Sequence, residues 1–312
     1  MDFNVVYGNH WNFGIGVGDT IRYLSKALND FGCNSRISKE PCNNSVNFFI
    51  ENFDEGYVLK IKELKEKGGY VVVVCTEFLT GCTFNDFMQV QSGGQYSDKE
   101  YWLGRFSRFL EIVPLCDSIC HLSDIAAIDF SNFLNRNVHY LPHRYVNNYK
   151  SVIHRSDSGK DIDFLFTGTV TDYRMEILNE LKKRGFNVEM SGMLTAQFYR
   201  DDLISRAKIC LNIPQSAAWK YPSQSRYFYH IINDSLVLSF LDGFRSDLDD
   251  FISLSSDNFI ESCIRELSAG EFNYRASIQN ERFKILGGSD SHLKVILDDV
   301  YKVAGSRSLF ND

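Results

Sequence analysis

The sequence predicts an α/β protein built from two doubly wound, Rossmann-like domains that face one another across a cleft. Short apolar runs alternate with amphipathic segments of helical period, and this alternation starts again after a polar stretch near residues 145–160. A length of 312 residues, of which 44% are hydrophobic, is enough for two cores. We expect an acceptor-side domain at 1–150 and a second domain at 151–312, with the last helix packing back on the first domain.

Composition narrows the classes of function. A net charge of −7 without any basic run disfavours a protein that grips nucleic acid. No apolar stretch approaches about 18 residues, and the N-terminus lacks a signal-like segment, so we expect a cytoplasmic protein without a membrane-spanning helix. The eight cysteines never form a CxxC pair, which favours reduced thiols over a disulfide scaffold or a zinc site.

The first half reads as strands that alternate with helices. Tyr70–Cys75 is continuously apolar, as strands buried on both faces are, and Pro142 should end the last strand of this half. Gln91–Lys99 is a polar insertion with the composition of a loop. The expected strands are Phe3–Tyr7, Val46–Ile50, Tyr70–Cys75, Ser118–Leu122 and Val138–Leu141, and the helices Asp19–Phe31, Lys60–Lys67, Tyr101–Val113 and Asp124–Leu134.

The second half repeats this order of elements. Lys208–Ile213, the following loop and helix, and Leu236–Phe240 have the pattern of a right-handed βαβ crossover between parallel strands. Ligands of such sheets bind beyond the C-terminal strand ends, where Pro214–Gln224 should lie. The expected strands are Ile162–Phe166, Asn187–Met190, Lys208–Ile213 and Leu236–Phe240, and the helices Tyr173–Lys183, Phe198–Ala207, one opening near Ser225, Asp257–Leu267, Gln279–Leu286 and Ser291–Val303.

Cations bracket that loop in the sequence. Arg206 and Lys208 precede it, and Arg226 follows at the start of a helix. Positive side chains beside a helix N-terminus suit phosphate, because free N–H groups and the helix dipole favour an anion there. The alternative for each of them is a solvated surface charge.

Polar groups also follow the strands of the first half. Glu51 and Glu77 come just past apolar strands, where open α/β enzymes place functional groups, although each could instead cap a helix or lie in solvent. His10 lies in a glycine-rich turn whose spacing, Gly14-x-Gly16-x-Gly18, is not the dinucleotide fingerprint. Asp19 follows that turn, and this position favours a role as helix N-cap over a chemical role.

Three segments of the second half carry a family resemblance: DIDFLFTGTVTDYR, LISRAKICLNI and SRYFYHIINDSLVLSF. Over roughly residues 161–300 they resemble the donor domain of GT-B-fold glycosyltransferases of the group-1-like type found in spore-maturation proteins. In the first half, CTEFLTGCTFNDF and YLPHRY are similar to bacterial surface-polysaccharide glycosyltransferases, less specifically.

The resemblance implies a metal-independent enzyme of polysaccharide biosynthesis that moves a sugar from a nucleotide-sugar donor to a glycan or lipid-linked acceptor. The enzyme that the resemblance implies needs no cofactor, and it could associate peripherally with a membrane. The Asp161-Ile162-Asp163 letters precede a strand, so we discount them as a metal motif. By the resemblance, the donor would be bound by Gly168, Thr169, Arg174, Arg206, Lys208, Ser225, Arg226 and Tyr229.

Tyr229 stands where many relatives carry a donor-binding glutamate. This departure leaves the identity of the donor open. It also leaves open that the protein resembles a glycosyltransferase but binds a nucleotide or sugar without transferring it. A third alternative is transfer to a modified nucleic-acid base, against which the acidic balance argues.

An inverting transferase needs a general base from the first domain, because the acceptor hydroxyl loses a proton as it attacks. The sequence leaves the stereochemistry open. The candidates are Glu77, then His10, with Asp19 and Glu51 behind them. Histidine accepts a proton near neutral pH, and a carboxylate does so once it is desolvated.

Overall fold

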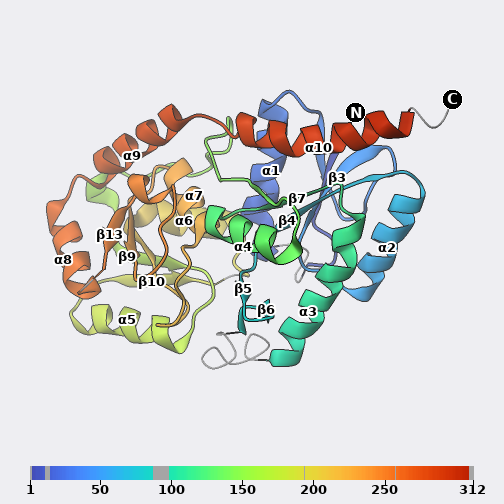
Figure 1. Cartoon of the computed structure of the whole chain (residues 1–312). Coiled ribbons are helices and arrows are strands. Elements are labelled where there is room, and N and C mark those ends of the chain that lie inside the picture. Colours follow the sequence, from blue (N-terminus) through green and yellow to red (C-terminus); the bar gives the residue numbers. More distant parts are fainter. Residues whose placement is uncertain (1, 11–14, 87–97, 193, 257, 309–312) are drawn as a thin grey trace. The chain divides into compact units, whose positions relative to one another are not determined.

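The computed structural model describes residues 2–10, 15–86, 98–192, 194–256 and 258–308. Among these residues the chain divides into two compact units (Figure 1). Unit 1 runs to Asn147 and resumes at Gly288, and unit 2 consists of Asn148–Gly287. The first division falls within the polar stretch of the sequence, and the second returns the last helix to unit 1.

Unit 1 is built on a parallel sheet with the strand order β2-β1-β3-β4-β7-β8. Since β2 and β3 flank β1 on opposite sides, the strand order reverses between β1 and β3. Such a reversal is a topological switch point, where the loops beyond the strand ends diverge and leave room for a ligand. The strands are β1 Asp2–Val6, β2 Ser35–Ser38, β3 Ser45–Ile50, β4 Tyr70–Cys75, β7 Ser118–His121 and β8 His139–Tyr140, with a separate hairpin of β5 Leu79–Thr80 and β6 Thr83–Phe84.

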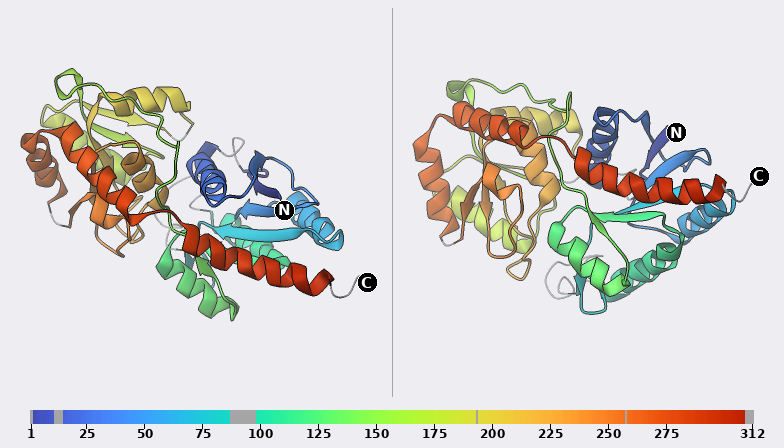
Figure 2. Two further views of the ribbon diagram at one scale, coloured as in Figure 1. Left: turned by 90° about the horizontal axis from the view of Figure 1, so that it is seen from above. Right: turned by 45° about the horizontal axis from the view of Figure 1, so that its top comes forward.

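Two helices of unit 1 begin at side-chain caps. The Asp54 side chain accepts a hydrogen bond from Tyr57 N at the start of α2, and Ser123 accepts one from Ala126 N at α4. The last helix, α10, lies along β7 and β8 (Figure 2), where His139 Nε2 is 2.6 Å from Asp299 Oδ2. The helices are α1 Gly18–Asp30, α2 Glu55–Glu66, α3 Lys99–Ile112, α4 Asp124–Leu134 and α10 Asp290–Ser308.

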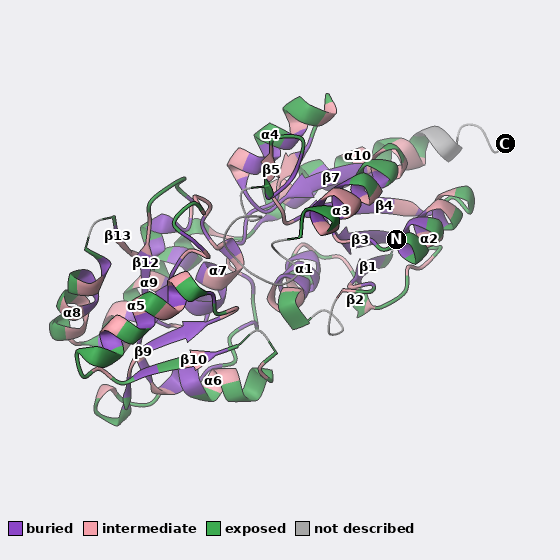
Figure 3. Ribbon diagram, turned by 90° about the horizontal axis from the view of Figure 1, so that it is seen from below, coloured by how far each residue is buried: buried purple, intermediate pink, exposed green. Residues whose placement is uncertain are grey.

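Unit 2 repeats the architecture with the parallel order β10-β9-β11-β12-β13, and its switch point lies between β9 and β11. Figure 3 shows the strands of both sheets mostly buried and the outer faces of the helices exposed, as in a doubly wound sheet. The elements are β9 Ile162–Thr167, α5 Asp172–Lys183, β10 Val188–Ser191, α6 Gln197–Arg206, β11 Ala207–Asn212, α7 Gln224–Ile232, β12 Val237–Phe240, β13 Ser253–Ser255, α8 Phe259–Ala269 and α9 Phe272–Leu286.

The predicted fold class, two doubly wound α/β domains, is confirmed. Sequence reasoning missed the edge strands β2 and β13, because their partly exposed Ser-rich residues form no apolar run. It also started α2 and α9 too late, at Lys60 and Gln279. Most of the insertion Gln91–Lys99 lies outside the described residues. No helix in the described part of the chain is long and apolar enough to cross a bilayer.

Buried histidines make the fold acid-sensitive. Burial lowers the pKa of His121 to about 4, and those of His143 and His230 to about 3. Below the ordinary histidine pKa of about 6.5, the unfolded chain therefore binds protons that the folded chain does not. Stability is fully present above that pH and should fall as the pH drops toward 4, by up to about 1.4 kcal/mol per pH unit for each histidine.

Urea unfolding between pH 7 and pH 5.5 measures this loss. His230→Asn, which keeps a hydrogen-bonding group beside Thr167, should lower the slope of the unfolding free energy against pH by up to about 1.4 kcal/mol per unit, a limit approached at the acidic end of the interval. An unfolding free energy that does not change over this interval would contradict the assignment.

Candidate active site

The switch point of unit 2 brings together the ends of β9 and β11 and the first turn of α7. Gly168 follows β9 with φ +129°, a backbone conformation that side-chain-bearing residues rarely adopt. A Cβ at this position would lie 2.5 Å from Arg226 Nη2. Glycine therefore allows the Arg226 guanidinium to approach the backbone at the end of β9.

Arg226 carries a positive charge that no described carboxylate neutralises. Its Nη1 donates to Asn212 Oδ1 at 2.6 Å, and its guanidinium carbon lies 5.1 Å from the centre of the Phe166 ring. Among the described residues, no Asp or Glu oxygen lies within 4.0 Å of its nitrogens. Burial lowers the pKa of Arg226 to about 10, so the side chain stays charged at neutral pH.

The first turn of α7 adds unsatisfied polar groups at the same edge. Ser223, the N-cap, forms no side-chain cap with the helix, so backbone N–H groups there lack that partner. The buried Gln224 side chain accepts from Ser246 Oγ, while its Nε2 has no partner in the described structure. Ser216 Oγ, in the preceding loop, is likewise buried and unpartnered there. Donors without acceptors favour an anion or a polar ligand.

Arg174 is buried beside the carboxyl edge of the unit 2 sheet and forms hydrogen bonds to two of its loops. It is 3% exposed, and it donates from Nε to Ile213 O at 2.9 Å and from Nη1 to Thr169 O at 2.6 Å. Burial, and then the charge of Arg226, lower the pKa of Arg174. Arg174 thus ties the turn at Gly168 and Thr169 to the end of β11, and the structure shows it bound to the protein's own carbonyls.

The structure does not bring Arg206 and Lys208 to this edge, which is against the expectation that they stand beside Arg226 at the donor phosphates. Both stand at the start of β11, whose Ala207 pairs with Ile162, the first residue of β9. They therefore lie at the amino edge of the sheet, opposite Asn212. Their partners there are the aspartates that the sequence shows as Asp161-Ile162-Asp163: Arg206 Nη2 is 2.5 Å from Asp161 Oδ2, and Lys208 Nζ is 2.7 Å from Asp163 Oδ1.

Two expected donor-binding residues lie on α7 besides Arg226. Ser225 is half-buried in its first turn, next to Arg226. Tyr229 is buried, its hydroxyl donates to Asp201 Oδ1 of α6, and its ring lies 3.8 Å below the Arg200 guanidinium. Tyr229 therefore packs against α6, one turn away from the helix N-terminus.

The switch point of unit 1 places His10 beside the end of β3. His10 Nε2 lies 3.3 Å from Ile50 O, and because a carbonyl only accepts, this nitrogen carries the proton. The basic lone pair is then on Nδ1. Burial, followed by the charge of Arg105, lowers the pKa of His10 to about 4, so the ring is neutral at pH 7.

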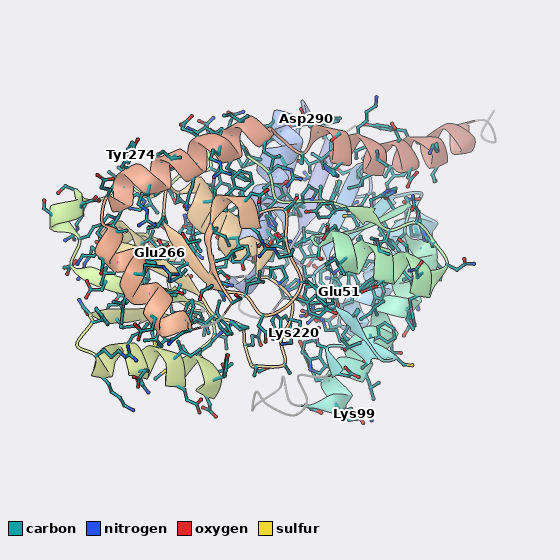
Figure 4. The ribbon with its side chains drawn as sticks, turned by 60° about the vertical axis from the view of Figure 1, so that its left-hand side comes forward. Glu51, Lys99, Lys220, Glu266, Tyr274 and Asp290 are labelled. Atoms are coloured by element: carbon teal, nitrogen blue, oxygen red, sulfur yellow. The ribbon has the colours of Figure 1, made fainter. Side chains whose placement is uncertain are left out.

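Arg105 of α3 joins the two predicted carboxylates. Its Nη2 lies 2.6 Å from Glu51 Oε2, its Nε 2.8 Å from Glu51 Oε1, and its Nη1 2.8 Å from Glu77 Oε1. Glu51, labelled in Figure 4, is fully buried, whereas the Glu77 side chain is 20% exposed. Asn85 Nδ2 donates to Glu77 Oε2 at 2.6 Å. Both carboxylate oxygens of Glu77 are thus held in place.

Burial raises the pKa of Glu51, and the bidentate contact with Arg105 opposes this effect. The pKa of Arg105 is raised on balance: burial lowers it, but the charges of Glu51 and Glu77 outweigh burial. The guanidinium therefore stays charged between the ends of β3 and β4.

Sequence reasoning missed Arg105 and His121. Arg105 gave no signal, because it lies inside an aromatic helix. His121 ends β7 and lies one residue before the end of the predicted strand Ser118–Leu122, so a search for polar residues at strand ends would have found it. His121 Nε2 donates to Glu77 O, and its Nδ1 accepts from Ser123 N, each at 2.9 Å. Asp19 lies in the first turn of α1, where Val17 is the N-cap, so the capping interpretation is wrong.

Sequence comparison gives no family for this chain: no family model and no curated protein matches it. Structure comparison does find similar folds. A UDP-forming alpha, alpha-trehalose-phosphate synthase from Burkholderia xenovorans is 8% identical, with a TM-score of 0.52, over 97% of this chain and 100% of that one. The chain has the GT-B fold. At this identity, the similarity describes the fold alone.

Two further GT-B structures match at lower TM-scores. The Gap123 complex from Streptococcus agalactiae matches with a TM-score of 0.47 and 8% identity, over 91% of this chain and 58% of that one. The kitacinnamycin glycosyltransferase matches with a TM-score of 0.40 and 8% identity, over 96% and 98%. This chain therefore spans little more than half of the Gap123 chain that it matches.

The Glu51–Arg105 pair should be essential for the stability of unit 1. Arg105→Ala leaves Glu51 buried without its counter-charge, which should lower the free energy of unfolding by about 3–5 kcal/mol. Chemical denaturation followed by far-UV circular dichroism measures the change. Lys62→Ala is the control, because Lys62 and Glu111 form a surface pair 43% and 49% exposed, worth less than about 1 kcal/mol. Equal losses for the two variants would contradict the analysis.

Proposed function

We propose that this protein is a metal-independent glycosyltransferase that moves a sugar from a nucleotide-sugar donor to the hydroxyl of a glycan or lipid-linked acceptor. The observation that carries the proposal is the uncompensated charge of Arg226 at the switch point of unit 2, beside the N-terminus of α7. The GT-B fold supports it, since distant neighbours with this fold are glycosyltransferases.

In this reaction the acceptor oxygen attacks C1 of the donor sugar, and the bond from C1 to the phosphate oxygen breaks. The electron pair of that bond remains on the departing nucleoside diphosphate, where negative charge increases. Arg226 and the N–H groups of the first turn of α7 would stabilise this charge without a metal. Gly168 and Thr169 would approach the diphosphate through their backbone.

Unit 1 would take the acceptor's proton if the enzyme inverts the configuration at C1. Glu77 stays the first candidate for this base, and Arg105 and Asn85 fix its two oxygens. His10 is the second candidate, because its tautomer leaves the basic lone pair on Nδ1. The protein would act in the cytoplasm, in polysaccharide biosynthesis. It would work at a membrane surface when the acceptor carries a lipid.

Nucleotide binding tests the donor site. UDP and inorganic pyrophosphate should bind the wild-type protein, and Arg226→Ala should weaken both by about ten- to a hundredfold, since a charge-assisted hydrogen bond contributes roughly 1.5–3 kcal/mol. Arg206→Ala and Lys208→Ala are matched controls that also remove a cation, but at the opposite edge of the sheet. Isothermal titration calorimetry with all four proteins measures this. If the control variants bind UDP and pyrophosphate more weakly while Arg226→Ala binds them as wild type does, the phosphate site lies at the amino edge of the sheet.

Turnover separates the two candidate bases. Glu77→Gln keeps the shape of the side chain and removes its charge, so it should retain UDP affinity and lower kcat by about a hundred- to ten-thousandfold. His10→Ala is the comparison, and normal turnover by Glu77→Gln with an inactive His10→Ala would reverse the roles. If the wild-type protein binds UDP but transfers no sugar from any donor in a panel, the protein is a binding protein and not a transferase.

A further inference from the structure

We propose that Asn212 is a positioning residue whose neutral amide orients Arg226 and leaves its positive charge available to a diphosphate. This inference rests on the proposed function and concerns the same site. Asn212 ends β11, and its Oδ1 accepts from Arg226 Nη1 at 2.6 Å. Asn212 is 4% exposed, so its side chain has little contact with solvent.

The side-chain partner of Arg226 is an uncharged amide and not a carboxylate. Arg105, Arg206 and Lys208, which also stand at strand ends or in the core, each have a carboxylate oxygen within 2.5–2.8 Å. A carboxylate neutralises such a cation and occupies the donors that would otherwise reach a ligand. An amide oxygen accepts one hydrogen bond from the guanidinium and adds no net charge, so the remaining guanidinium N–H donors keep their positive potential.

A buried network holds the amide of Asn212 in place. Asn212 Nδ2 donates to Tyr227 Oη at 3.2 Å and to Ser239 Oγ at 2.9 Å. These two hydroxyls lie 2.6 Å apart, and both residues are fully buried. Because a guanidinium only donates, the amide oxygen faces Arg226, and the amide nitrogen faces the two hydroxyls, which can accept.

The surroundings of Arg226 strengthen its attraction for an anion. Arg174 is a second arginine at this edge, and the charge of Arg226 is close enough to lower its pKa. The guanidinium carbons of Arg174 and Arg226 lie 4.9 and 5.1 Å from the centre of the Phe166 ring. These two arginines lie beside one aromatic ring, and neither has a carboxylate partner among the described residues. They therefore create a region of positive potential. A doubly charged phosphate group compensates such a region better than an uncharged nucleoside does.

Two variants of Asn212 separate charge from orientation. Asn212→Asp places a carboxylate against Arg226 and should weaken the binding of pyrophosphate and UDP by about ten- to a hundredfold, with a flatter dependence of affinity on salt. Asn212→Ser keeps the site neutral but loses the amide that orients the guanidinium, so it should weaken binding by less than tenfold and keep the wild-type salt dependence. Uridine, which has no phosphate, should bind all three proteins equally.

Calorimetric titrations at two salt concentrations, with Arg226→Ala alongside, decide between the outcomes. If Arg226→Ala binds pyrophosphate as wild type does, the phosphate site of the proposed function is itself wrong. If Arg226→Ala loses affinity while both Asn212 variants match wild type, the phosphate site stands and the role of Asn212 is overturned. Equal losses for the two Asn212 variants with unchanged salt dependence would overturn the role of charge. If Asn212→Asp does not fold, Asn212→Ser decides alone, and unchanged affinity overturns the proposal.

Discussion

The direction of the parallel strands is the constraint on which both candidate sites depend. Because every strand of a sheet runs the same way, all carboxyl ends meet at one edge, and the loops there diverge where the strand order reverses. In unit 1 this reversal places His10 beside Ile50 and Glu51, and in unit 2 it places Gly168 beside Asn212. Residues at the amino ends, such as Arg206 and Lys208, are excluded from these sites however close in sequence they stand.

The two switch points differ in how their charges are balanced. In unit 1, Arg105 lies between two carboxylates, so the cluster is compensated internally and its geometry is fixed. Replacing such a buried pair by apolar residues of similar volume is often neutral for stability, whereas removing one partner alone is costly. In unit 2, Arg226 meets an amide and an aromatic ring, and its charge is left for a ligand. One edge thus has carboxylates held by an arginine, and the other has a cation without a described carboxylate partner.

Much of the fold could be predicted from periodicity, because the central strands are continuously apolar: Tyr70–Cys75 was predicted with its correct bounds. Edge strands such as β2 lack that signal. Among the site residues, Glu77 and Arg226 could be found because each follows from its place relative to a strand end or a helix start. The partners that define their chemistry could not. Arg105 is distant from Glu51 in sequence, and the pairing of Arg206 with Asp161 depends on the register of β11 against β9, which no local pattern encodes.

The placement of Tyr229 bears on how a donor would be recognised. Its ring and hydroxyl face Arg200 and Asp201 of α6, so α7 presents no carboxylate along this turn to a ligand at its N-terminus. The described groups at the carboxyl edge of unit 2 are then Arg226, backbone N–H groups and the neutral side chains of Gln224 and Ser216. Under the proposed function, these groups would bind a diphosphate, which every nucleoside diphosphate sugar carries, and they would not distinguish one sugar from another. Affinity for the donor and selectivity for its sugar would then be separate properties, and the first would persist when the second changes.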